Sequence, residues 1–399
     1  MPVTNHPRRD GRETVVVEKM AAGGDGIAHA ADGRVLFVEG GLPGERVVVH
    51  VHTTKKDFAK GVVTDVLDAS NHRAVPPCPA VAAGCGGCQW QHVDADGQLA
   101  LKRDIVVDAL RRTAKLPDAE VAIGGAVPPW GYRTTMRFAV APNGRLGLRA
   151  AGSHRVVVLD ECPVAHPSLS ALLPSVLVHG ADEVSLRVSV TTGEVTALLI
   201  GGRRDARVTG LPGHAAVGPA AMLREVVAGA SLRVSAASFF QSGPAAAELL
   251  VSTVRAACGP LLQDGGPVLD AYGGVGLFAA ALPMAQPWVV ESSASACADA
   301  RANLPNATVE CTSFEDWDVR PMRLVVADPA RAGLGARGAE VVVATGAERV
   351  VLVSCDPVAM ARDAALLTGS GYRHAGSTVL DLFPNTPHVE VVTTFDRPV

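Results

Sequence analysis

The stretch Val350-Val351-Leu352-Val353-Ser354-Cys355-Asp356-Pro357 joins an apolar run to one cysteine and then stops at Asp-Pro. A short aliphatic run bounded in this way predicts a buried parallel strand. Ligands bind at the carboxyl ends of strands in an open α/β sheet, so Cys355 is expected where chemistry takes place. A structural thiol is the alternative, because free cysteines are among the most buried residues. The neighbouring segments must decide between the two.

Other segments of the same half end at the same expected edge. Residues 268–277, Val-Leu-Asp-Ala-Tyr-Gly-Gly-Val-Gly-Leu, predict a strand, a glycine turn and a helix. Such glycines let the backbone approach a nucleotide-like ligand closely. The next strand ends at Glu291, about twenty residues on, where a carboxylate can bind two ribose hydroxyls. A third strand ends at Asp328. The pattern alone does not separate a dinucleotide from S-adenosylmethionine.

The carboxyl-terminal run Phe383-Pro384-Asn385-Thr386-Pro387-His388-Val389-Glu390 is interrupted by prolines and leads into a last strand, residues 391–395. An extended backbone places His388 and Glu390 on one side. By itself, this position predicts an ordinary solvent-exposed strand residue at Glu390.

Length and charge limit the class of protein. A chain of 399 residues predicts two or three domains, and 48% hydrophobic residues support a well-buried core. A net charge of −4 excludes a uniformly basic protein. The charge is uneven, however, because five arginines and no acid lie between Trp130 and Arg155. This segment suits a polyanion, with a solvated positive face as the alternative.

The first ten residues lack the apolar core of a signal peptide, and no stretch is expected to span a bilayer. We therefore expect a cytoplasmic protein. In a reducing compartment, eight cysteines favour a metal site, a catalytic thiol or plain burial over disulfides.

The amino-terminal residues 13–68 alternate short valine-rich runs with glycine turns. Short strands at this spacing predict a small antiparallel barrel. The order of the strands and the phrase Gly-Leu-Pro-Gly-Glu-Arg-Val, residues 41–47, resemble the TRAM domain, an OB-like module of RNA-modifying enzymes. A generic small barrel is the alternative.

Three cysteines, Cys78, Cys85 and Cys88, form a C-x6-C-x2-C array in a loop rich in glycine and proline. Thiolates on tight turns can converge on one centre, and Cys162 is the best candidate for a fourth ligand. Four thiolates suit either structural zinc or an iron-sulfur cluster.

The segment after this loop predicts an amphipathic helix from Ala95 to Thr113 and then a β-hairpin around Pro142-Asn143-Gly144. Arginines at even spacing along the hairpin strands are expected to point from one face toward phosphates.

Together these segments resemble the RNA 5-methyluridine (uracil-5-) methyltransferase family. They are most similar to its 23S ribosomal RNA branch, which joins a TRAM domain, a [4Fe-4S] site and an S-adenosylmethionine domain. The likeness covers nearly the whole chain in the same order. It rests on the cysteine array with Gln91-His92, the Gly-Arg-Leu-Gly hairpin, Glu161-Cys162-Pro163-Val164, Ser238-Phe239-Phe240-Gln241, Asp328-Pro329-Ala330-Arg331, Ser354-Cys355-Asp356-Pro357 and residues 383–390.

The resemblance implies an α/β and β multidomain chain with three parts. These are a TRAM domain (12–69), a central β-rich RNA-binding domain with a four-cysteine site (70–230), and a Rossmann-like S-adenosylmethionine-dependent methyltransferase domain (231–399). It implies a [4Fe-4S] cluster at Cys78, Cys85, Cys88 and Cys162, cofactor contacts from Gln241, Tyr272, Glu291 and Asp328, a nucleophile at Cys355 and a base at Glu390. The expected partner of this monomer is 23S rRNA, with tRNA as the alternative and no membrane.

The chain departs from the family pattern at a few positions. The interval after Cys78 is one residue longer than is common, Gly273 stands where a cysteine is common, and Leu277 replaces an asparagine that often binds the cofactor. Ser313 and Asp356 also differ from the usual residues. None of these changes removes a catalytic group.

The chemistry of uracil explains why a thiol and a base are both needed. Carbon 5 is a poor nucleophile until a thiolate adds to carbon 6, and the methylated adduct then needs a base to remove the proton from carbon 5. A stacked uracil must also be flipped out to be reached. A cytosine-5 methyltransferase and a non-catalytic RNA-binding protein are the rivals. The terminal Pro-His-Val-Glu and the four cysteines favour uridine.

Overall fold

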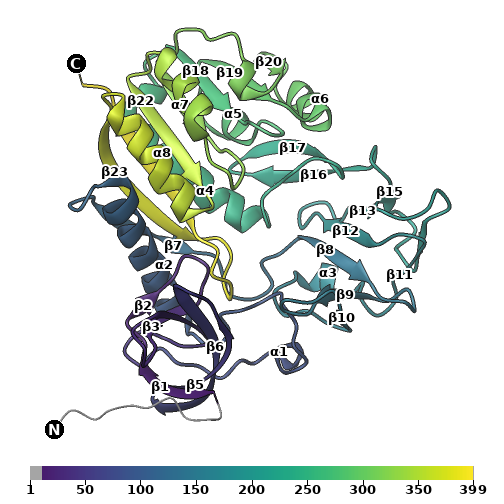
Figure 1. The fold of residues 1–399 in the computed structure, drawn as a ribbon. Helices are drawn as coiled ribbons and strands as arrows, with labels where there is room; N and C mark the ends of the chain where they lie inside the picture. Colours follow the sequence, from purple (N-terminus) through teal and green to yellow (C-terminus); the bar gives the residue numbers. More distant parts are fainter. Residues whose placement is uncertain (1–10, 399) are drawn as a thin grey trace.

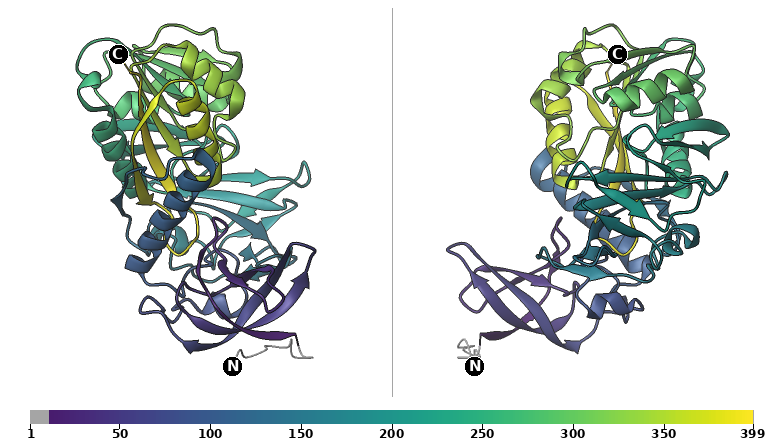
Figure 2. Two further views of the ribbon diagram at one scale, coloured as in Figure 1. Left: turned by 60° about the vertical axis from the view of Figure 1, so that its left-hand side comes forward. Right: turned by 90° about the vertical axis from the view of Figure 1, so that its right-hand side faces the viewer.

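The computed structural model describes residues 11–398, which form three parts (Figure 1). A small β-barrel lies at the bottom of the view, a β-rich part lies beside it, and an α/β part lies above both. Figure 2 shows the same three parts from two further sides. The segment Met1–Asp10, for which no signal peptide is expected, lies outside the described residues, as does Val399.

The amino-terminal part is one six-stranded sheet in the order β1-β5-β6-β4-β3-β2. Its neighbours are antiparallel except for β4 and β6, which run parallel. Alternate residues of β5 face inward, so Val47 and Val49 are buried while Arg46 and His50 are exposed. The strands are β1 (Arg12–Val16), β2 (Lys19–Met20), β3 (Gly26–His29), β4 (Val35–Glu39), β5 (Arg46–Thr54) and β6 (Phe58–Asp68).

The central part is built on a second six-stranded sheet in the order β10-β9-β8-β12-β13-β15. The predicted hairpin around residues 142–144 is confirmed as the antiparallel pair β8 and β9. The strands are β8 (Thr135–Val140), β9 (Leu146–Arg149), β10 (Val156–Val158), β11 (Leu177–His179), β12 (Glu183–Val188), β13 (Val195–Ile200), β14 (Arg207–Thr209) and β15 (Ala216–Val217), with the short helices α1 (Pro79–Ala82) and α3 (Pro167–Ser170).

The carboxyl-terminal part is an eight-stranded sheet in the order β20-β19-β18-β21-β22-β24-β23-β7. The run from β20 to β22 is parallel, and β24 is antiparallel to both β22 and β23. The strands are β18 (Pro267–Ala271), β19 (Gln286–Glu291), β20 (Thr308–Cys311), β21 (Leu324–Ala327), β22 (Arg349–Ser354), β23 (Arg373–Asp381) and β24 (Glu390–Asp396), and a ribbon of β16 (Met222–Val227) and β17 (Ala230–Ser235) precedes them.

Helices cover both faces of this sheet, which explains why its inner strands β21 and β22 are almost entirely apolar and buried (Figure 1). In β22, Val351 and Val353 belong to one core cluster while Val350 and Leu352 belong to the other. The predicted buried parallel strand is therefore confirmed. The helices are α4 (Pro244–Cys258), α5 (Leu277–Ala281), α6 (Ala294–Asn303), α7 (Gly335–Ala344) and α8 (Pro357–Gly369).

Two elements from the range assigned to the central domain join this sheet instead. Helix α2 (Ala95–Ala109) continues as one π-helical segment (Leu110–Ala114) and packs on β7, β23 and α8. Strand β7 (Val121–Ala126) pairs in parallel with β23 at the sheet edge. The three parts therefore do not follow one another strictly along the chain.

One helical segment, Pro244–Leu262, is long and apolar enough by composition to cross a bilayer, although no such stretch is expected from the sequence. Its buried residues include Leu250, Val251 and Val254, which belong to the same core cluster as Val351 of the sheet. The apolar face of this helix is thus used within the fold.

A buried ion pair fixes α2 against the sheet. Lys102 is fully buried, and its Nζ donates to Asp381 Oδ1 at 2.6 Å and to the Phe383 carbonyl at 3.2 Å. Asp381 is the last residue of β23. Burial lowers the pKa of Lys102 and raises that of Asp381, while each charge counteracts the shift of the other. Each ion therefore needs its partner to remain charged inside the protein.

We predict that Lys102→Met lowers the apparent free energy of unfolding by about 3–5 kcal/mol, because it leaves the Asp381 carboxylate buried without a partner. Urea denaturation followed by circular dichroism measures this change. The exposed pair Arg46–Asp68 is the matched control, and Arg46→Ala should cost less than about 1 kcal/mol. Equal losses in the two variants would contradict the importance of burial.

Candidate active site

Cys355 and Glu390 lie opposite one another at the ends of adjacent strands. The last pair of the β22–β24 ladder is Ser354 with Val391. Cys355 directly follows Ser354 and Glu390 directly precedes Val391, so both residues lie at the end of this ladder. The carboxylate of Glu390 is close enough to act on the charge of the Cys355 thiol. Cys355 is half-buried and Glu390 is 4% exposed.

The surroundings of Cys355 hold its thiol in the protonated form. Burial raises the pKa of Cys355 to about 11, and the carboxylates of Glu390 and Asp328 add to this rise. The guanidinium of Arg331 acts in the opposite direction. The thiol is therefore within electrostatic reach of Glu390 at the start of β24 and of Asp328 and Arg331, which both follow β21.

Buried acids gather at this edge of the sheet. Burial raises the pKa of Glu390 well above its usual range, and Asp328 raises it further. Burial also raises the pKa of Asp328 to about 7. Asp270 is completely buried, its Oδ1 has no hydrogen-bond partner, and its pKa is raised by burial and by the charges of Asp328 and Glu291. No ion pair joins Asp270, Asp328 or Glu390 to a cation of residues 11–398.

Asp270 is a residue that the sequence interpretation did not single out. It is the fourth residue of β18, and its Oδ2 accepts the amide N–H of Ala279 at 3.1 Å. An acid inside a buried strand, next to the glycine turn, was the available signal.

The glycine turn and the neighbouring strand are joined through Glu291. The Gly274 amide donates to Glu291 Oε2 at 2.9 Å, and the Ser293 amide donates to Oε1 at 2.6 Å. The Ser292 hydroxyl also donates to Oε1, at 3.4 Å. A carboxylate oxygen has two acceptor positions, so Oε2 can still accept a hydroxyl. This geometry suits the predicted ribose contact.

Tyr272, directly after β18, and Gln241, just before α4, are the other two predicted cofactor residues. Tyr272 adopts a left-handed φ of 58°, and its hydroxyl donates to Glu315 Oε1 at 2.7 Å. Gln241 is buried, at 6% exposure, and follows the segment Ser238-Phe239-Phe240. Phe239 is 73% exposed.

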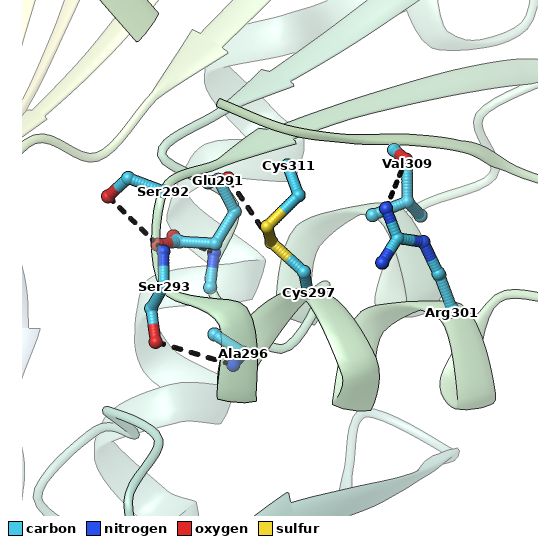
Figure 3. The surroundings of a disulfide bond; sticks show 9 residues. Glu291, Ser292, Ser293, Ala296, Cys297, Arg301, Val309 and Cys311 are labelled. Atoms are coloured by element: carbon cyan, nitrogen blue, oxygen red, sulfur yellow. Dashed lines mark hydrogen bonds between the residues drawn. A yellow bond between two sulfur atoms is a disulfide. The ribbon is translucent and has the colours of Figure 1, made fainter. Parts of the chain in front are cut away.

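A disulfide lies directly behind Glu291. Figure 3 shows Cys297 of α6 bonded to Cys311 at the end of β20, with the Cys297 sulfur 3.2 Å from the Glu291 carbonyl oxygen. The expectation that metal sites, catalysis or burial account for the cysteines does not hold for this pair. The fourteen-residue separation of the two cysteines hides their contact from local sequence reasoning, because α6 folds back along β20.

The four cysteines of the predicted cluster line one small apolar pocket together with Leu148 and Leu159. Burial raises the pKa of Cys85 and Cys162, and it raises that of Cys88 to about 11. Within residues 11–398, however, no three His, Cys, Asp or Glu side chains come close enough to hold a metal ion. The four-cysteine metal site is therefore not confirmed by this geometry.

The arginine hairpin is less free than its sequence predicts. Arg137 and Arg149 both pair with Glu183 on β12, and Arg145 pairs with Asp160. These acids come from outside the window of five arginines, so a local count of charges overestimates the free positive charge. Arg137 remains 64% exposed at its side chain.

Two arginines approach the loop before Glu390. The Arg331 guanidinium lies 3.5 Å from His388 Nε2, and Arg133 lies over the ring of Phe383 at 5.8 Å from its centroid. Burial and these two positive charges lower the pKa of His388 to about 4. His388 is therefore neutral at physiological pH, and Arg133 Nε is buried without a partner.

Comparison with known proteins agrees with this architecture. Residues 11–64 match the TRAM domain model. The chain is 33% identical to an RNA methyltransferase of Streptomyces avermitilis, over 96% of this chain and 97% of that protein. It is 31% identical to the 23S rRNA (uracil(1939)-C(5))-methyltransferase RlmD of Halomonas elongata, over 98% and 90%.

The fold has a solved counterpart in the Pyrococcus abyssi tRNA (uracil-54, C5)-methyltransferase, which was crystallised with S-adenosyl-L-homocysteine. The two share 24% identity with a TM-score of 0.70, over 96% of this chain and 99% of that one. The fold and the relatives at more than 30% identity over nearly their full length lead to one conclusion. The chain belongs to the RNA (uracil-C5) methyltransferase family.

Proposed function

We propose that this enzyme methylates carbon 5 of a uridine in 23S rRNA, with Cys355 as nucleophile, Glu390 as base and S-adenosylmethionine as methyl donor. The observation that carries the proposal is the opposition of Cys355 and Glu390 across the ends of β22 and β24. A nucleophile and a base at the ends of adjacent strands can reach adjacent carbons of one ring.

Cys355 acts first in this mechanism. Its sulfur forms a bond to carbon 6 of the uracil, and the electron pair of the 5,6 double bond moves to carbon 5 and the carbonyl oxygen at carbon 4. The thiol must lose its proton before it attacks, and its pKa of about 11 opposes this. The Arg331 guanidinium lowers that pKa and so favours the thiolate.

S-adenosylmethionine supplies an electrophilic methyl group at this site when it is bound. Glu291 would hold the ribose, and Tyr272, Gln241 and Asp328 would complete the cofactor contacts. The charge of S-adenosylmethionine fits this site, because Asp270, Asp328 and Glu390 form an acidic group without a cationic partner in the described chain. A positively charged ligand would relieve their mutual repulsion and lower their pKa values.

Glu390 acts last. The methylated adduct carries a proton on carbon 5, and the Glu390 carboxylate accepts it while the 5,6 double bond re-forms and the Cys355 sulfur leaves carbon 6. Burial makes Glu390 a stronger base than a solvated carboxylate, since its pKa is raised well above the usual value.

Support for the RNA target comes from the relatives and from the TRAM match, because the similar proteins of Halomonas elongata and Methylococcus capsulatus are named as 23S rRNA enzymes. Transfer RNA is the alternative. The cytoplasmic location and the monomeric state stay predictions from the sequence.

For the cysteine pocket we retain the proposal of a [4Fe-4S] cluster held by Cys78, Cys85, Cys88 and Cys162. The convergence of these four thiols on one apolar pocket supports it.

We predict that Cys355→Ala abolishes transfer of labelled methyl groups into unmodified rRNA, while Glu390→Gln accumulates a covalent enzyme–RNA adduct. Denaturing gels detect the adduct, and the double variant should form none. Cys258→Ala, a change at a buried thiol elsewhere in the fold, is the control and should retain activity. Undiminished turnover in the first two variants would exclude the mechanism, and preference for tRNA would replace the rRNA assignment.

The raised pKa of Cys355 makes a pH-dependent prediction. Below a pKa of about 11 the thiolate fraction rises about tenfold per pH unit, so alkylation of Cys355 in the free enzyme should accelerate to the same degree between pH 7 and pH 10. Peptide mass spectrometry after iodoacetamide treatment measures the rate at this residue. Arg331→Ala should slow the reaction at each pH, and a rate that is independent of pH would contradict the buried, protonated thiol.

For the cysteine pocket we predict iron and acid-labile sulfide in protein purified without oxygen. Cys88→Ala should lose both, because one of four ligands is removed, while Cys258→Ala should retain them. Metal analysis and the visible absorption spectrum provide the measurement. Stoichiometric zinc without sulfide would refute the cluster.

A further inference from the structure

The segment before Glu390 is held mainly by residues that are distant from it in sequence. We call residues 382–389 the base loop. At its centre, Asn385 is 3% exposed and has a left-handed φ of 68°. Its amide N–H donates to Gln98 Oε1 at 2.6 Å, and its side-chain Nδ2 donates to the Pro129 carbonyl at 2.8 Å. Its carbonyl accepts the Trp90 amide N–H at 2.9 Å.

The TRAM domain reaches the same loop. The buried indole of Trp90 donates through Nε1 to the Gly24 carbonyl at 3.0 Å, in the turn between β2 and β3. Gly24 has a φ of 95°, and a Cβ placed on it would lie 2.6 Å from Pro387 Cβ and 3.1 Å from Trp90 Nε1. The TRAM turn is thus in direct contact with both the base loop and the residue that supports it.

Trp90 also joins three parts of the chain through its packing. It belongs to a small core cluster of Met20 and Leu42 from the TRAM domain, Val93 from the cysteine loop and Ile105 from α2. A change at Trp90 or Gly24 therefore acts on the base loop directly, through Asn385 or Pro387.

Cys355 is anchored differently. It follows β22, which is paired on both sides by β21 and β24 inside the apolar sheet. Glu390 is the first residue of β24, directly after the base loop. A displacement of the loop would therefore move Glu390 before it moved Cys355.

We propose that Gly24 and Trp90 are positioning residues that set the place of Glu390 through the base loop. In addition to any contact with RNA, the TRAM domain would then help Glu390 to remove the proton from carbon 5, which releases the Cys355 sulfur. This inference rests on the proposed roles of Cys355 and Glu390.

The test separates the two halves of the reaction. In Gly24→Ala the added methyl group pushes against Pro387, and in Trp90→Phe the hydrogen bond to Gly24 is lost. Both variants should form the covalent adduct at close to the normal rate, and its breakdown should slow by about tenfold to a hundredfold, because misplacement of a catalytic group by about 1 Å costs rate on this scale. Rapid-quench assays with labelled RNA measure both rates.

Gly33→Ala is the matched control. Gly33 lies in another turn of the TRAM domain, has a φ of 86°, and a Cβ there meets no atom within 4 Å. Gly33→Ala introduces similar backbone strain to Gly24→Ala but no contact with Pro387. The Gly33→Ala variant should therefore form and release the adduct at the rates of the unmodified enzyme. Thermal unfolding of each variant confirms that the fold is kept.

Three outcomes would overturn the positioning role. They are equal slowing of adduct formation and breakdown, weaker RNA binding as the sole effect, and equal behaviour of Gly24→Ala and Gly33→Ala. If Gly24→Ala unfolds, Trp90→Phe carries the test alone. Failure of the proposed function is distinguishable, since Glu390→Gln itself would then trap no adduct.

Discussion

The buried pair of Lys102 with Asp381 is the interaction on which the active-site end of the sheet depends. It ties α2, which precedes the central sheet in the chain, to the last residue of β23 and to the carbonyl of Phe383. Two buried charges are stable only as a pair. If α2 left the sheet, Asp381 would remain buried without its lysine. This constraint explains why α2 and β7 belong to the methyltransferase sheet.

The same edge of the sheet carries charge that is not balanced within the described chain. Burial raises the pKa values of Asp270, Asp328 and Glu390, and the charge of Asp328 raises those of Asp270 and Glu390 further, which costs stability in the free protein. Acids are kept in such places when a ligand or a reaction needs them. Asp381 differs from these three acids because it is paired with Lys102. We therefore interpret Asp381 as a structural acid and the other three as acids of the site.

The sequence predicted features that depend on neighbouring residues better than features that depend on contacts between distant segments. Strand β22, helix α2 and the β8–β9 hairpin were predictable because apolar periodicity and turn residues are local properties. The placement of Cys355 and Asp328 at one edge followed from the parallel order of their strands. The pairing of Arg137 with Glu183, the Cys297–Cys311 disulfide and the place of β7 depend on distant segments, and no local pattern contains them.

The base loop shows how distant segments hold the residues directly before the proposed base, Glu390. A left-handed backbone costs about 1–2 kcal/mol for a residue with a side chain, although asparagine tolerates it better than most. Asn385 keeps this conformation because it donates hydrogen bonds to Gln98 and to the Pro129 carbonyl and accepts one from the Trp90 amide. Strain that is held by three separate segments persists only while all three stay in place. The position of Glu390, one residue beyond this loop, is therefore a property of the whole chain.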